Sequence, residues 1–212
     1  MAFAVRAGTN NLASLDNLAR WGRNVNPTCP MEGCNSVGTL GHLLSSCPQQ
    51  LDRYSFRHDS ILLHLVTSIH RMKKENIEVY ADLPGWQTNG GTVPHNMAMT
   101  EQRPDLVIIN RDRVPTKITL VELTCCWDSK GAFRAALERK SDRYERLVDD
   151  LKENGLNASM VALEVGCRGV SDLRNHANIE GICNEVGIRA IKKMRGALGK
   201  NHSSYIYLFT FA

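Results

Sequence analysis

Apolar residues fall into two short runs between positions 103 and 124, in the stretch RPDLVIINRDRVPTKITLVELT. Two runs of mostly β-branched residues flank a short polar turn, a pattern that predicts two neighbouring β-strands buried on both faces of a sheet. The runs are Val107, Ile108 and Ile109 in the first strand, and Ile118, Leu120, Val121 and Leu123 in the second. These two strands are the predicted centre of the fold.

Two acidic residues interrupt this apolar stretch. Asp105 begins the first predicted strand, and Glu122 lies inside the second. A carboxylate in a buried strand is costly unless it is paired with a cation or holds a metal ion. We therefore expect Asp105 and Glu122 to meet across the neighbouring strands and to bind a divalent cation together.

Helical and strand patterns alternate around this centre, which predicts an α/β domain with a central mixed sheet flanked by helices. Apolar spacings of three and four residues predict one amphipathic helix within the first 28 residues and long helices at 51–73 and 129–152. Further strands are expected at 77–81, 158–165 and 205–211, helices at 171–186 and 187–198, and an exposed loop at 83–98. Trp86 in this loop is expected to cover the domain edge, with base stacking as the alternative.

Two polar residues lie on the apolar stripes of the long helices. In helix 129–152, Lys140 fills one step of the stripe formed by Phe133, Leu137, Tyr144, Leu147 and Leu151. A lysine there either reaches solvent at the sheet edge or pairs with acids, and the two acids favour pairing. His58 lies on the stripe of helix 51–73, where a histidine is usually a hydrogen-bonded core residue. Its neighbours Arg57 and Asp59 leave open a role beside a metal site.

A cluster of potential metal ligands precedes these elements, with the spacing Cys29-x4-Cys34-x7-His42-x4-Cys47. Three thiolates and one imidazole can close a tetrahedron around Zn²⁺, and so small a segment needs the metal to fold. Because protein ligands fill all four positions, the expected zinc is structural; the alternative is four unrelated residues. The expected division is a helical linker at 1–28, a zinc knuckle at 29–50 and one larger domain at 51–212.

Composition sets limits on the function. The chain has 212 residues, and its net charge of +4 permits a nucleic-acid partner without requiring one. No apolar run approaches the roughly 20 residues of a membrane helix, so no membrane partner is expected. Seven cysteines, an odd number that includes the adjacent Cys125 and Cys126, favour a reducing, intracellular setting. A late basic segment is either a phosphate-contacting or a solvated helix face, and it carries Arg189, Lys192, Lys193, Arg195 and Lys200.

The expected acid site has the parts of a metal-dependent phosphodiesterase. Two carboxylates and a backbone carbonyl near Leu123 form a hard oxygen site suited to Mg²⁺ or Mn²⁺. Such an ion would activate a water for in-line attack on a phosphate, and Lys140 would stabilise the charge that develops. Thr124 shares a strand face with Glu122, because side chains along a strand repeat every two residues.

The segments Arg103-Pro104-Asp105 and Glu122-Leu123-Thr124, with Lys140, resemble the PD-(D/E)xK motif of restriction-like endonucleases. They follow a CCHC cluster and the triplet Arg57-His58-Asp59, and they precede ERKSDRYERL and VALEVGCRG. This order is similar to the C-terminal region of site-specific non-long-terminal-repeat retrotransposon proteins, over about residues 29–200. The chain departs from the general nuclease pattern at Thr124, where many relatives place lysine.

The resemblance implies a restriction-like endonuclease domain at 51–212, in which Asp105 and Glu122 hold the catalytic metal beside the Leu123 carbonyl already expected there. Lys140 would be the catalytic lysine, and Arg143 stands at the position where a second lysine is expected. The possible accessory residues are His58, Asp59, Thr124, Arg143 and Tyr144, and Arg103 joins the late basic residues as a nucleic-acid contact.

The resemblance also implies a reaction and partners. Proteins of that family nick target DNA in the nucleus, and the new 3′-hydroxyl primes reverse transcription of the element RNA by a reverse transcriptase. Because no reverse-transcriptase motif is present, we expect an excised C-terminal portion or a stand-alone derivative. Two other classes of function stay open: a nucleic-acid-binding domain without turnover, and a structural or interaction domain of a larger polyprotein.

Overall fold

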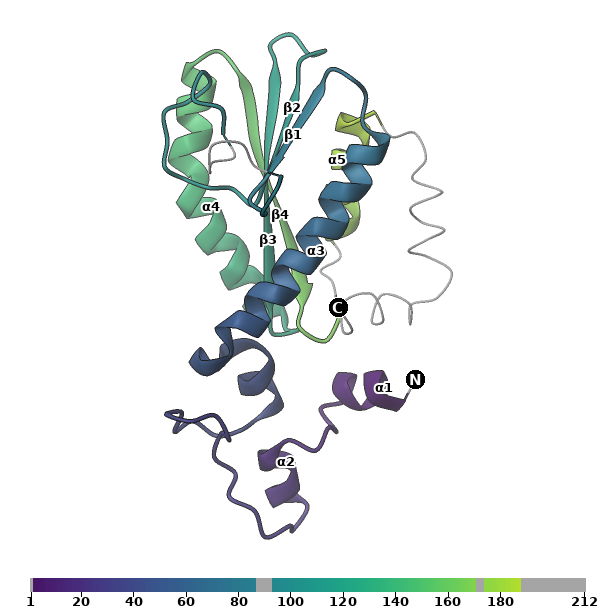
Figure 1. The fold of residues 1–212 in the computed structure, drawn as a ribbon, viewed down its shortest axis with the longest axis vertical. Coiled ribbons are helices and arrows are strands. Elements are labelled where there is room, and N and C mark those ends of the chain that lie inside the picture. The colour runs from purple at the N-terminus through teal and green to yellow at the C-terminus, as the bar shows by residue number, and fades with distance from the viewer. Residues whose placement is uncertain (1, 87–92, 171–173, 188–212) are drawn as a thin grey trace.

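The computed structural model describes residues 2–86, 93–170 and 174–187, which form a mixed α/β structure (Figure 1). In chain order the elements are α1 (Ala2–Gly8), α2 (Leu15–Arg20), two short helical turns (His42–Ser46 and Pro48–Gln50), α3 (Leu51–Met72), β1 (Ile77–Ala81), β2 (Leu106–Asn110), β3 (Lys117–Cys126), α4 (Lys130–Glu153), β4 (Asn157–Gly166) and α5 (Arg174–Glu185). The predicted central strands and both long helices are thus confirmed. Among the described residues, no helix combines the length and apolar content needed to cross a membrane.

The four strands form one mixed sheet in the order β1-β2-β3-β4. β1 pairs antiparallel with β2, and β2 pairs antiparallel with β3. β3 and β4 are parallel and are joined through α4, as parallel neighbours require a crossover connection. The mixed sheet predicted from the alternation of helical and strand patterns is therefore present.

Helices cover both faces of this sheet. Figure 1 shows α4 on one face and α3 with α5 on the other. One core cluster joins β2 and β3 to α4, and a second joins the same strands to α3 and α5. All five residues of β2 are consequently buried, which matches the continuous apolar run expected of a strand covered on both faces.

The N-terminal region contains two short helices where the sequence predicts one. Ser14 ends the connection between them, because its side chain caps α2 by accepting a bond from the Asn17 amide. The Asn17 side chain in turn donates to the carbonyls of Asn10 and Leu12, each at 2.7 Å. These bonds hold the connection in a turn, so the apolar spacing there does not continue as a helix.

Two details of the apolar pattern also differ from prediction. The apolar spacing that predicts α3 runs from Leu51 to Met72, but both of these residues are exposed, whereas Ile61 and Val66 are buried. The predicted exposed loop at 83–98 contributes several buried residues, Leu83, Val93, Met97 and Ala98. Trp86 packs against the α3-side core, which fits the expected edge-covering role. The predicted helix at 187–198, apart from its first residue, and the strand at 205–211 lie outside the described residues.

Candidate functional site

The two acids lie at what we call the split in the sheet, the point where β2 ends while β3 continues alongside β4. Leu106, the first residue of β2, pairs with Val121, and β3 continues beyond this point paired with β4. Asp105 and Glu122 lie one position further along. The Asp105 amide donates to Glu122 Oε1 at 3.0 Å, and the Leu123 amide donates to Asp105 Oδ2 at 2.8 Å. Each carboxylate is therefore fixed by a backbone amide of the opposite strand.

Lys140 reaches the acids from α4. Its Nζ contacts Glu122 Oε2 and lies 3.7 Å from Asp105 Oδ2. The Glu122 side chain is 0% exposed, so it depends on this ammonium and on the Asp105 amide for compensation. Of the two expectations for Lys140, the structure has the paired one rather than the edge lysine.

His58 approaches Asp105 from the opposite layer, α3. Its Nε2 lies 3.3 Å from Asp105 Oδ2, and its Nδ1 lies 3.0 Å from Asp59 Oδ1. The histidine is thus neither a plain core residue nor remote from the acids. Asp105 is contacted by side chains from both helical layers because it sits at the end of a strand, between the two faces of the sheet.

The surrounding charges shift the pKa values of these groups in different directions. Burial opposes ionisation of Asp105, but the hydrogen bond and charge of His58, together with Lys140, hold its pKa below the usual range. Burial and the charge of Asp105 raise the pKa of Glu122 against the opposing contact of Lys140. Burial lowers the pKa of His58, but its contacts with Asp105 and Asp59 prevail and raise it to about 9. The cluster therefore combines an anionic Asp105 with cationic partners.

The other predicted accessory residues lie around this cluster in different ways. Tyr144 is buried, and its hydroxyl donates to the Arg103 carbonyl at 3.1 Å, which ties α4 to the segment before β2. The Arg103 side chain pairs with Asp82. Arg143 is exposed, and its backbone carbonyl accepts a hydrogen bond from the Gln102 side chain. Thr124 is half-buried on β3. At Leu123 it is the amide that contacts an acid, whereas sequence reasoning placed its carbonyl in the site.

The late basic residues that sequence reasoning assigns to nucleic-acid contact lie outside the described part of the chain. They are Arg189, Lys192, Lys193, Arg195 and Lys200.

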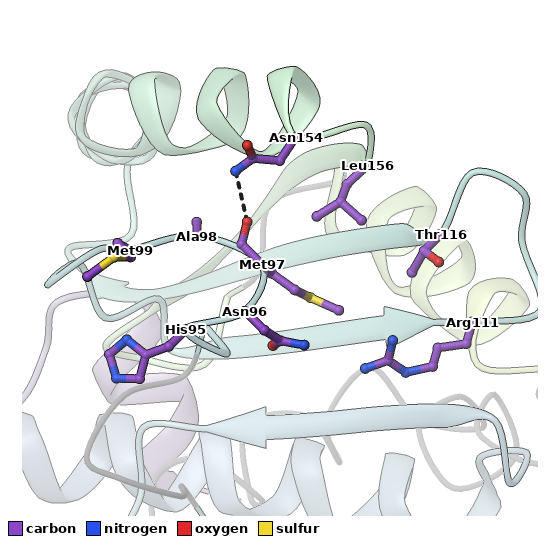
Figure 2. A pocket seen from close by; sticks show the side chains of 9 residues that line it. All are labelled: His95, Asn96, Met97, Ala98, Met99, Arg111, Thr116, Asn154 and Leu156. Carbon is purple, nitrogen blue, oxygen red and sulfur yellow. Dashed lines mark hydrogen bonds between the residues drawn. The ribbon is translucent and has the colours of Figure 1, made fainter.

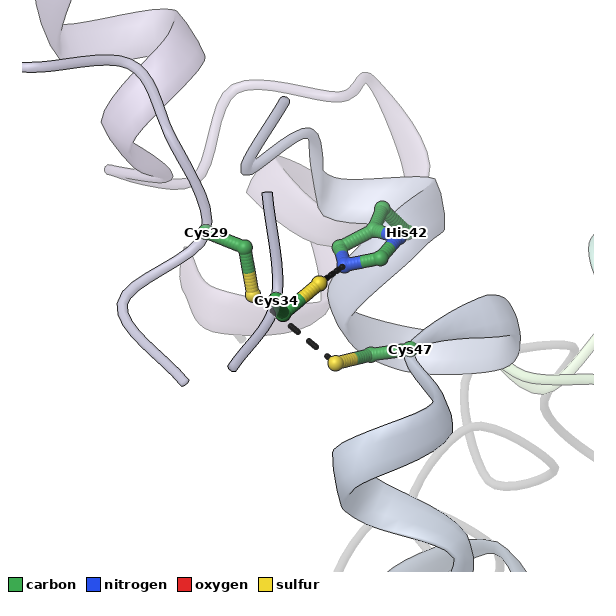
Figure 3. Close-up of side chains that lie close together, drawn as sticks. All are labelled: Cys29, Cys34, His42 and Cys47. Atoms are coloured by element: carbon green, nitrogen blue, oxygen red, sulfur yellow. Dashed lines mark hydrogen bonds between the residues drawn. The ribbon is translucent and has the colours of Figure 1, made fainter. Parts of the chain in front are cut away.

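The four predicted zinc ligands converge. The side-chain donor atoms of Cys29, Cys34, His42 and Cys47 all lie within 4.8 Å of one another. Cys34 Sγ lies 3.3 Å from His42 Nε2, and Cys29 Sγ lies 3.8 Å from Cys47 Sγ. Figure 3 shows these four side chains turned toward one another. Hydrogen bonding to the Ser36 amide lowers the pKa of Cys34 to about 7, which favours the thiolate that a metal binds. These residues could hold a metal ion, and three thiols with one imidazole are compatible with zinc.

This cysteine–histidine cluster is fastened to the first turns of α3. The Tyr54 hydroxyl accepts from the Cys47 amide at 2.9 Å and lies 3.2 Å from the carbonyls of His42 and Leu43. Arg57 donates to the Leu44 carbonyl at 2.6 Å. Spacing alone cannot reveal these supports, because their partners are backbone amides and carbonyls rather than particular side chains.

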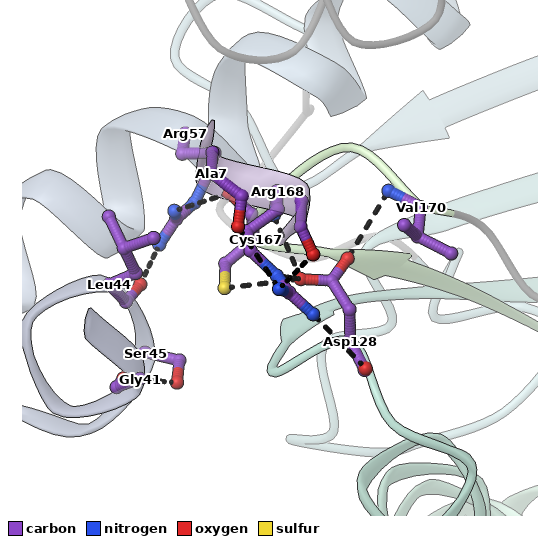
Figure 4. A network of polar contacts seen from close by, with 10 residues as sticks. Ala7, Gly41, Leu44, Ser45, Arg57, Asp128, Cys167, Arg168 and Val170 are labelled. Carbon is purple, nitrogen blue, oxygen red and sulfur yellow. Dashed lines mark hydrogen bonds and ion pairs between the residues drawn. The ribbon is translucent and has the colours of Figure 1, made fainter. Parts of the chain in front are cut away.

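A second polar network joins the N-terminal segment to the far end of β4 (Figure 4). The buried Asp128 carboxylate accepts from Arg168 Nε at 2.8 Å and from the Val170 amide at 3.2 Å. Arg168 also donates to the Ala7 carbonyl at 3.1 Å, and its guanidinium lies 4.2 Å from the centre of the Trp127 ring. These groups are fully engaged with one another, so we assign them to holding the fold together.

A shallow pocket of ≈ 520 Å³ lies at the opposite end of β2 from the acids (Figure 2). Its lining includes Met97, Arg111, Thr116 and Asn154. The Asn154 side chain donates to the Met97 carbonyl at 2.9 Å, and Arg111 is paired with Glu78. The pocket is therefore separate from the acid pair.

Comparisons of the chain with protein-family models, curated proteins and solved structures found no match.

Proposed function

We propose that this protein is a divalent-metal-dependent DNA endonuclease with a restriction-like catalytic domain. The single observation that carries the proposal is the arrangement of Asp105, Glu122 and Lys140 at the split in the sheet. Two carboxylates held by backbone amides offer hard oxygen donors suited to Mg²⁺ or Mn²⁺. A lysine from the following helix meets them, in agreement with the resemblance to the PD-(D/E)xK motif.

The residues have separate roles in the proposed reaction. A bound divalent cation would polarise a phosphoryl oxygen and would lower the pKa of a water molecule. Asp105 and Glu122 hold this cation, and Lys140 stabilises the negative charge that develops on the phosphate. Attack of the water oxygen on phosphorus forms one P–O bond and breaks the bond to the 3′-oxygen; the water gives up one proton, and the 3′-oxygen takes one up. The products are a 5′-phosphate and a 3′-hydroxyl.

A retroelement role extends this proposal. A 3′-hydroxyl at a nick can prime reverse transcription, so the DNA target would be joined by an element RNA and a reverse transcriptase as partners in the nucleus. Support for this extension comes from the order of the cysteine–histidine cluster, the Arg57-His58-Asp59 triplet and the acid motifs along the chain. The cluster would bind Zn²⁺ as a structural ion.

Nicking of supercoiled plasmid DNA tests the proposal. With Mg²⁺ or Mn²⁺ we expect relaxed circles, and we expect Asp105→Asn, Glu122→Gln and Lys140→Met each to lower the rate by roughly 100-fold or more. Lys152→Met, an exposed change on the same helix as Lys140, should leave the rate unchanged. If all four variants nick DNA at the rate of the parent protein, this site is excluded as the source of activity.

One observation favours a second candidate, a nucleic-acid-binding domain without turnover. Lys140 and His58 already supply two cationic partners for the two acids within the fold. In that case the cluster would be a structural ion-pair network, and binding would fall steeply with salt concentration. Salt-dependent DNA binding without metal-dependent cleavage would favour this candidate over the nuclease.

A further inference from the structure

His58 is an unusual companion for the acid pair because it comes from the opposite layer of the fold. Asp105 and Glu122 sit on the sheet, and Lys140 comes from α4, whereas His58 comes from α3. Its imidazole is three-quarters buried, with 24% of the side chain exposed. Both ring nitrogens lie near carboxylate oxygens, so each has a hydrogen-bond acceptor within reach.

The contacts of Asp105 are unevenly shared between its two oxygens. Oδ2 faces three donors: the Leu123 amide at 2.8 Å, His58 Nε2 at 3.3 Å and Lys140 Nζ at 3.7 Å. These donors fix one edge of the carboxylate and direct the other oxygen, Oδ1, away from them. A carboxylate oriented in this manner presents a defined oxygen to an incoming cation, which is the usual role of hydrogen bonds around metal ligands.

His58 is itself held from two directions. Asp59 Oδ1 lies 3.0 Å from its Nδ1, which places a carboxylate on the ring nitrogen opposite Asp105. The helix that carries it is anchored by Tyr54, one turn earlier, and by the adjacent Arg57, which contact backbone carbonyls of residues 42–44. The imidazole is therefore positioned by the fold before any cation arrives, as an effective support must be.

We propose that His58 is a positioning residue that orients the Asp105 carboxylate for divalent-cation binding through its Nε2–H, and that Asp59 orients His58. This inference rests on the proposed cation site. It assigns His58 no contact with the cation or the DNA. Loss of the Nε2 donor should therefore lower the affinity for the cation. This loss of affinity is separate from any change in folding stability.

Binding of Mn²⁺ to the intact chain, followed by electron paramagnetic resonance, measures this effect without requiring cleavage. Loss of a hydrogen bond to a metal ligand typically costs 10–100-fold in affinity, so His58→Ala should weaken Mn²⁺ binding by about 10-fold or more. His58→Gln keeps a side-chain N–H donor and should remain within about threefold of the parent. His64→Ala, an exposed change on the same helix, is the matched control and should bind as the parent does.

The outcomes separate this inference from the nuclease proposal. If His58→Ala binds Mn²⁺ as tightly as the parent, His58 does not position Asp105, whatever the nicking assay shows. Equal weakening by His58→Ala and His58→Gln would likewise overturn the role of the donor. No Mn²⁺ binding by the parent chain would overturn both proposals. Weaker binding in His58→Ala alone, without any nicking by the parent, would support the positioning role and reject the nuclease.

Discussion

Replacement of Lys140 by methionine is the change whose effect on the free energy of unfolding follows most directly from the structure. Methionine keeps an unbranched stem but removes the ammonium that contacts Glu122, whose side chain is 0% exposed. Removing one partner of a buried ion pair costs about 3–5 kcal/mol. Because the Lys140 side chain is 20% exposed, we expect the lower end, about 3 kcal/mol. For a chain of this length that corresponds to a fall in Tm of about 6–12 °C.

The size of this loss should depend on pH and on divalent cations. Burial and Asp105 already raise the pKa of Glu122 in the parent, and loss of Lys140 raises it further. The orphaned carboxyl group then takes up a proton as the pH falls, so the difference from the parent should be large at pH 8 and smaller at pH 5. If the acids bind Mn²⁺, the added cation should stabilise the variant more than the parent, since it supplies the missing positive charge.

Thermal and urea denaturation at pH 8 and pH 5, each with and without Mn²⁺, measure these differences. Lys152→Met is the control, because Lys152 is exposed on the same helix and pairs with the exposed Asp149; it should change stability by less than about 0.5 kcal/mol. Equal stability of the Lys140 and Lys152 variants at pH 8 would refute the energetic importance of the buried contact. A variant that gains no stability from Mn²⁺ would speak against a cation site at the acids.

Three further predictions concern other parts of the molecule. Metal analysis should find about one Zn²⁺ per chain, and its chelation should unfold the cysteine–histidine segment in circular dichroism; metal-free protein with unchanged structure would contradict this. Gly166→Ala places a Cβ 1.6 Å from Asp128 Oδ1 and should cost about 2–3 kcal/mol in urea denaturation, whereas Gly181→Ala, with open space around it, should be neutral or stabilising. NMR titration should give His58 a pKa near 9, since Asp105 raises it. The shift from 6.5 would add up to about 3 kcal/mol of stability below pH 6.5, lost as the pH rises through 9, and a titration near 6.5 would contradict it.

The centre of the fold could be predicted because its signals are local. The apolar runs specify β2 and β3, and the helical period placed Lys140 on the sheet-facing side of α4. The ligand spacing likewise identified the cysteine–histidine cluster, because its four residues lie close in sequence. These features need no knowledge of partners elsewhere in the chain.

Other features depend on contacts that no local pattern contains. The bond between the Leu123 amide and Asp105 exists because β2 ends where β3 continues, and strand ends are poorly determined by periodicity. Arg168 donates to the carbonyl of Ala7, 161 positions away. Every residue type has a backbone carbonyl, so the sequence does not indicate which one accepts this bond. The predicted N-terminal helix is present as α2, but the prediction missed α1 and the turn between the two helices, which depends on side-chain bonds from Asn17.

The most direct test of the central claim is anomalous diffraction from crystals of the protein soaked in Mn²⁺. We predict an anomalous peak bound by oxygens of Asp105 and Glu122, with Lys140 beside it, and loss of that peak in Asp105→Asn crystals. Well-ordered carboxylates without a peak between them, at Mn²⁺ concentrations that support nicking or saturate binding in solution, would contradict a metal site at the split in the sheet.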